Sequence, residues 1–159
     1  MYKLENEKQI EIADFYLPFG GKLKEENRWV IMSKKVPWKD IEKDYAKFFS
    51  DSQLGAPAKS VRIALGALII KERLQISDRE VVEQIKESPY LQFFIGFEGF
   101  QDEIPFDSSM MVHFRKRFSY NAIGKVNELL IRIHREEEQK KKQTAQNRLK
   151  RQRRKTRGN

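Results

Sequence analysis

The segment from Ser60 to Leu74 is apolar on nearly every side of a helical wheel. One face carries apolar side chains at helical spacing, and Ile63, Ala67 and Ile70 extend the apolar surface around the helix. A helix of this kind is normally buried at the centre of a domain. Gly66 in its middle indicates that a neighbouring element packs closely there. The chain must therefore supply other elements that surround this helix.

Those surrounding elements are also expected to be helical. The sequence has no internal repeat and no convincing pair of strands, whereas apolar spacings of three and four recur along it. Two short helices that meet at a turn and pack on longer ones are typical of a helix-turn-helix. We therefore predict an all-α, multi-helix domain with a helix-turn-helix-like part, and an irregular aromatic arm over 15–21. The expected helices cover 27–33, 38–49, 60–74, 77–87, 89–95, 108–118 and a long segment from Asn121.

Positive charge is concentrated at the C-terminus. The chain carries a net charge of +9, yet residues 139–159 hold ten Lys or Arg and no acid. An inner stripe of Ile123, Val126, Leu130 and Ile133 also ends before this segment. We predict a domain over 1–138 and a basic tail over 139–159 that is disordered from Thr144 onward. Such a tail either binds polyanions or has no role.

Residue types that carry enzyme chemistry are sparse. The chain has no cysteine, and its two histidines, His113 and His134, fit no zinc spacing. Neither a phosphate-binding glycine loop nor a nucleophile elbow is present. Acids alternate with lysines over 39–44, as on a solvated helix face. We therefore expect no catalytic residue, no metal and no cofactor. No secretory signal is visible, and the apolar run Ala64–Ile70 is too short to span a bilayer.

The segment Ile104–Phe118 is the most informative for function. On a helical wheel one side is apolar and holds Met110, Met111, Phe114 and Phe118. The opposite side holds Ser109, Val112, His113 and Lys116, and Arg115 and Arg117 lie at its two borders. The helix expected over 108–118 is about 16 Å long and can lie in a DNA major groove, and Asp107 is a suitable N-cap. The alternative is an ordinary surface helix. The candidate DNA-binding residues are Ser109, His113, Arg115, Lys116 and Arg117.

A second candidate is an aromatic cluster of Tyr90, Phe93, Phe94, Phe97 and Phe100. Such a cluster could stack on bases. Its helical spacing and the scarcity of nearby basic residues favour a place in the hydrophobic core instead.

Several short blocks of the chain form a pattern by their order and spacing. They are Leu17-Pro18-Phe19-Gly20-Gly21, Asn27-Arg28-Trp29, Gly55-Ala56-Pro57-Ala58, Leu68 to Leu74, Ser77-Asp78-Arg79-Glu80, Ser88 to Gly96, Pro105 to Ser109 and His113 to Phe118. In this order and spacing the blocks resemble the N-terminal domain of insertion-sequence DDE transposases of the InsH-like group. The resemblance covers about residues 15–135.

The resemblance implies binding of double-stranded DNA at terminal inverted repeats, in a bacterial, cytoplasmic, nucleoid-associated protein. It also implies a following ribonuclease-H-like domain in which three acids hold two metal ions. Nothing after Arg135 resembles that domain, so we expect a truncated, non-enzymatic fragment. Its partners would be DNA and a second copy or the intact transposase. The alternatives are a module for transposase assembly through the 123–133 stripe, a remnant of a frameshifted element, or a nuclease active alone.

Overall fold

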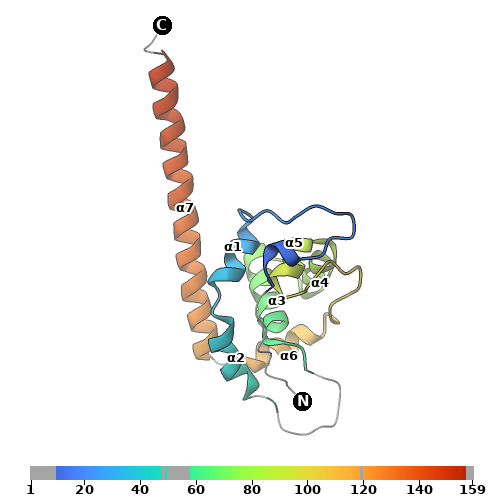
Figure 1. Cartoon of the computed structure of the whole chain (residues 1–159). Helices are drawn as coiled ribbons and strands as arrows, with labels where there is room; N and C mark the ends of the chain where they lie inside the picture. Colours follow the sequence, from blue (N-terminus) through green and yellow to red (C-terminus); the bar gives the residue numbers. More distant parts are fainter. Residues whose placement is uncertain (1–9, 48, 50–57, 119, 157–159) are drawn as a thin grey trace. The chain divides into compact units, whose positions relative to one another are not determined.

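The computed structural model describes residues 10–47, 49, 58–118 and 120–156 (Figure 1). It divides into two compact units, Met1–Ala122 and Ile123–Asn159. Among the described residues every regular element is a helix, which confirms the all-α prediction. The elements are η1 (Ile12–Asp14), α1 (Arg28–Lys35), α2 (Trp38–Ala46), α3 (Val61–Leu74), α4 (Asp78–Glu87), α5 (Pro89–Phe94), α6 (Met110–Arg117) and α7 (Tyr120–Thr156).

Helix α3 is central, as its apolar surface predicts. It packs against α2, α4 and α6. Ser60 caps it by accepting a hydrogen bond from the amide of Ile63 at 3.2 Å. A Cβ added at Gly66 would lie 2.9 Å from Cγ2 of Ile95, so only glycine allows the observed approach. The close packing predicted at Gly66 is confirmed.

The N-terminal arm is fixed on the domain by apolar and backbone contacts. Phe15 and Leu23 are buried in one cluster with Val30 and Phe93. The arm also pairs with the segment after α5, because the Tyr16 amide donates to the Glu98 carbonyl at 3.1 Å. The predicted aromatic cluster belongs to this core: Phe93 and Phe94 are buried, and Tyr90, Phe97 and Phe100 are partly buried against the arm.

Gln92 on α5 is a fully buried polar side chain, and no pattern in the sequence indicates its burial. Its Nε2 donates to the carbonyls of Ile85, Lys86 and Gln101 at 3.1, 3.1 and 2.8 Å. Its Oε1 accepts from the Gln101 amide at 2.8 Å. This one amide therefore joins the end of α4 to α5 and to the loop that leads toward α6.

Helix α7 continues to Thr156, through the segment in which the sequence analysis predicts disorder. Lys, Arg and Gln are good helix formers, so the composition permits the helix without any buried face. The Thr144 hydroxyl donates to the Lys140 carbonyl at 2.9 Å, one turn earlier. The side chains of Ile123, Leu130 and Ile133 lie outside the described part. No helix in the described ranges has the length and apolar character of a membrane span.

Candidate nucleic-acid interface

Helix α6 is held on the domain by its inner side. Met111 and Phe114 are fully buried, and the Phe114 ring lies 5.1 Å from that of Phe106 in an edge-to-face arrangement. The helix begins two residues later than predicted, and the Asp107 carboxylate accepts from the Ser109 amide at 2.8 Å in the preceding turn. Hydrogen bonds from Ser109 lower the pKa of Asp107. The sequence places the buried side of α6 correctly.

The outer side of α6 faces solvent. Ser109, Val112, His113 and Lys116 are all exposed. Within the described residues, neither His113 nor Lys116 has a hydrogen bond or an ion pair through its side chain. These two side chains are therefore available to an external partner, on a helix whose orientation is already fixed.

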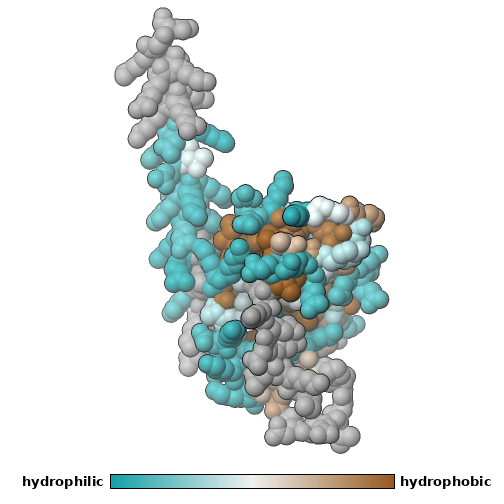
Figure 2. Space-filling view, viewed as in Figure 1, coloured by the Kyte–Doolittle hydropathy of each residue, from teal (hydrophilic) through white to brown (hydrophobic). Residues whose placement is uncertain are grey.

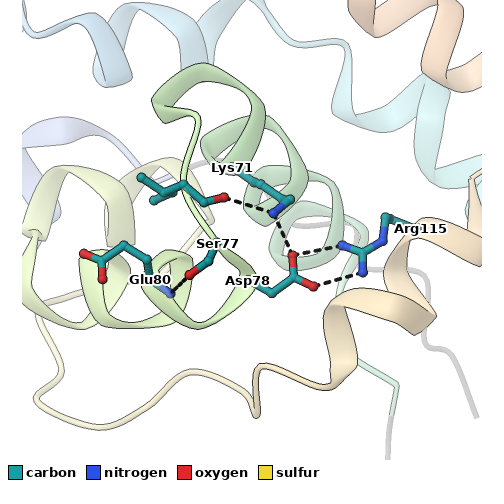
Figure 3. Close-up of polar contacts among 6 residues, drawn as sticks. Lys71, Ser77, Asp78, Glu80 and Arg115 are labelled. Atoms are coloured by element: carbon teal, nitrogen blue, oxygen red, sulfur yellow. Dashed lines mark hydrogen bonds and ion pairs between the residues drawn. The ribbon is translucent and has the colours of Figure 1, made fainter.

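Arg115 has a partner within the domain. Its Nη1 and Nη2 donate to the two carboxylate oxygens of Asp78 at 3.0 and 2.9 Å (Figure 3). Lys71 Nζ lies 3.0 Å from Asp78 Oδ1 and also donates to the Ile76 carbonyl at 2.9 Å. The bonded guanidinium of Arg115, and then Lys71, hold the pKa of Asp78 below its usual value. One carboxylate thus connects α3, α4 and α6.

Arg117 also has contacts within the domain. Its Nη1 donates to the Tyr45 hydroxyl at 3.4 Å, and its Cζ lies 4.8 Å from the centre of the Phe49 ring. Burial raises the pKa of Tyr45, whose hydroxyl donates to the Lys59 carbonyl at 3.1 Å. Arg117 therefore connects the end of α6 to α2.

An open groove lies where α4 and α6 begin. It is shallow and widely open to solvent, with a volume of about 650 Å³. Its lining has one acidic side chain, Asp78, and three basic ones, Lys71, Arg79 and Arg115. Lys71 and Arg79 are not among the DNA-binding candidates predicted from the sequence. The excess of two positive charges favours an anionic partner. The lining residues are Lys71, Ser77, Asp78, Arg79, Ser108, Ser109, Val112 and Arg115.

Ser77 and Glu80 have the Ser-x-x-Glu spacing of a capping box, which forms in part at the start of α4. The Glu80 amide donates to Ser77 Oγ at 3.2 Å, as in the full motif. The Glu80 carboxylate instead accepts from Gln84 Nε2 at 3.0 Å. Ser77 thus places Asp78 at the first position of α4, where its carboxylate reaches Arg115.

Asp78→Asn should lower the free energy of unfolding by about 1 kcal/mol at neutral pH, since a bidentate pair is at the upper end for exposed ion pairs. The lowered pKa of Asp78 means that its stabilising effect is present above the unfolded-state pKa. This effect is lost as the pH falls through the folded-state pKa. Urea unfolding of both proteins across pH 7 to 2 measures the difference, which should shrink as the pH falls.

The control is Glu83→Gln, which neutralises an exposed acid on the same helix. It should change the free energy of unfolding little at any pH between 7 and 2. A pH-independent difference between Asp78→Asn and the unsubstituted protein would contradict the ionic origin of the effect.

Comparisons with known proteins add a family match. A family model described as a transposase domain (DUF772) matches residues 18–117. "Uncharacterized protein ORF8 in nfe locus" of Rhizobium meliloti is 42% identical over 82 residues, which cover 52% of this chain and 39% of that protein. The match thus spans about two fifths of the relative's length. No solved structure matches the chain.

Proposed function

The chain belongs to the transposase domain (DUF772) family, and we propose that it is the part of an InsH-like insertion-sequence transposase that binds terminal inverted repeats. The outer side of α6 would enter the major groove. Strand cleavage would belong to a separate ribonuclease-H-like domain, and we assign none of it to these residues. DNA binding would place the protein at the bacterial nucleoid.

The observation that carries this proposal is that α6 has two different sides. Its inner side is buried in the domain, and its outer side is exposed. A helix of eight residues is about 12 Å long, which the major groove accommodates. Ser109 near its start is small enough to allow close approach. Lys116 offers three N–H donors to base edges, and His113 offers a ring nitrogen.

The groove between α4 and α6 supports the same proposal. Proteins take much of their affinity for DNA from contacts to phosphates, which also fix the register of the reading helix. Lys71 and Arg79 lie beside α6 at this groove. Arg115 is 42% exposed and keeps donors beyond the two that bind Asp78. We infer that Lys71, Arg79 and Arg115 contact phosphates while the outer side of α6 faces the bases.

Lys116→Ala should weaken binding to the inverted repeat by about 1–3 kcal/mol, roughly five- to 150-fold, and should weaken binding to random duplex much less. A side chain that hydrogen-bonds a base edge contributes mainly to the free energy of binding the cognate site, which here is the inverted repeat. Fluorescence anisotropy with duplexes from the ends of the element, and with shuffled duplexes, measures both affinities at one salt concentration.

Lys43→Ala is the matched control, because Lys43 is an exposed lysine on α2. It should leave the ratio of the two affinities unchanged. An equal loss on cognate and random duplexes for Lys116→Ala would count against base reading by α6.

A further inference from the structure

The last part of α7, residues 139–156, is a basic helix, which we call the basic extension. It holds nine Lys or Arg and no acid. Every side chain described from Gln139 to Arg148 is exposed. In Figure 2 the visible described surface of α7 is hydrophilic almost throughout. The family match ends at residue 117 and does not include this segment. The proposed recognition of DNA by α6 does not use it either.

The charge density of the basic extension is close to that of duplex DNA. From Lys140 to Lys155 a helix rises about 22 Å, so its nine basic groups average one per about 2.5 Å. Duplex DNA carries one negative charge per about 1.7 Å of its axis. A helix of this kind can neutralise several neighbouring phosphates at once.

The arrangement of these charges argues against other partners. At about 100° per residue, Lys140, Lys141 and Lys142 point in three different directions, so the helix has no single basic face. Leu149 is the only large apolar residue in the segment. A helix that lies on a membrane or pairs in a coiled coil needs a continuous apolar face.

We propose that the basic extension is a second DNA contact, which binds the phosphates of duplex DNA without regard to base sequence. This contact does not depend on base reading by α6. It holds the protein on any duplex and so raises the local concentration of α6 near DNA. Repulsion between like charges one turn apart weakens the free helix, and phosphate binding removes that repulsion. The helix should therefore unfold at a higher temperature when duplex is added.

The test uses the full chain with K140Q, K141Q and K142Q combined, since glutamine removes the charge but retains helix propensity. Its partner is a random duplex of about 20 base pairs, which is longer than the extension. Affinity should fall about tenfold to a hundredfold near 0.1 M salt, and the slope of log affinity against log salt should decrease by about 1 to 2, because three lysines that point in different directions do not all reach one duplex. The ratio of cognate to random affinity should not change.

The matched control combines K34Q, K39Q and K43Q, which remove the same charge from exposed positions of α1 and α2. This variant should keep the salt slope of the unsubstituted chain. Equal slopes in the two triple variants would overturn the proposal, because the effect would then follow net charge alone. Tighter binding to anionic lipid vesicles or to double-stranded RNA than to DNA would overturn it as well.

The two proposals can fail separately. If Lys116→Ala leaves the cognate preference unchanged while the K140Q, K141Q and K142Q variant loses affinity, the basic extension is a DNA contact and α6 is not the reading helix. Thermal unfolding followed by circular dichroism that shows no shift on addition of duplex would contradict the coupling between α7 and DNA.

Discussion

Gln92→Leu is expected to lower the free energy of unfolding by about 2–4 kcal/mol. Leucine is similar in volume to glutamine, so the main loss is polar. The carbonyls of Ile85, Lys86 and Gln101 and the Gln101 amide would lose their shared partner. Leaving a buried polar group without a partner costs about 1–3 kcal/mol. The shift of the urea midpoint, followed by circular dichroism, measures the loss.

Gln84→Leu is the control, because Gln84 lies on the neighbouring α4 and its side chain has one exposed partner. Surface changes of this type usually stay within about 0.5 kcal/mol. A Gln92→Leu protein as stable as the control would show that the buried amide does not hold α4, α5 and the following loop together.

The sequence predicts the fold well where burial leaves a periodic pattern. The apolar surface of Ser60–Leu74 predicts a central helix, and Gly66 predicts a close neighbour. The spacing of the aromatic residues after Ser88 correctly favours core over base stacking. The expected starts of the helices over 27–33 and 77–87 also agree with the structure, where Asn27 caps α1 and Ser77 caps α4. These signals are local, and the structure bears them out.

The contacts of the candidate interface depend on partners far away in the sequence. Arg115 and Arg117 are both expected to contact DNA, yet each has a partner in the domain, 37 and 72 residues earlier. No helical periodicity links Asp78 or Tyr45 to α6, so these pairs emerge only from the fold. The sequence therefore identifies the basic helix but does not separate side chains that fix α6 from side chains that it presents.

Composition also gives an incomplete account of the C-terminus. After Ile133 the sequence has one large apolar residue, Leu149, and no apolar stripe. The signal for packing is therefore lost, and the composition predicts disorder from Thr144. Helix propensity acts on each residue separately and needs no buried face. A basic segment of good helix formers can continue an existing helix, as α7 does to Thr156.

Phe114→Ala should be the most destabilising of these changes, at about 3–5 kcal/mol, because it removes a large, fully buried aromatic ring from a well-packed core. The ring contacts Phe106 and lies on the side of α6 that packs toward α3. Urea unfolding measures the loss. Val112→Ala is the control on the outer side, where the side chain is 43% exposed and truncation should change stability by less than about 1 kcal/mol.

A milder substitution of the same residue, Phe114→Leu, tests how the core affects the proposed DNA contact. A major-groove helix reads bases only when its orientation is fixed, and Phe114 and the Asp78–Arg115 pair fix α6 from two sides. Phe114→Leu keeps part of the buried volume and should cost less than about 1.5 kcal/mol if the core repacks, so that the protein stays folded. We expect this variant to lose cognate affinity while its affinity for random duplex, carried by the basic extension, changes little. Cognate affinity unchanged in a measurably destabilised Phe114→Leu protein would show that a fixed α6 is not what recognises the inverted repeat.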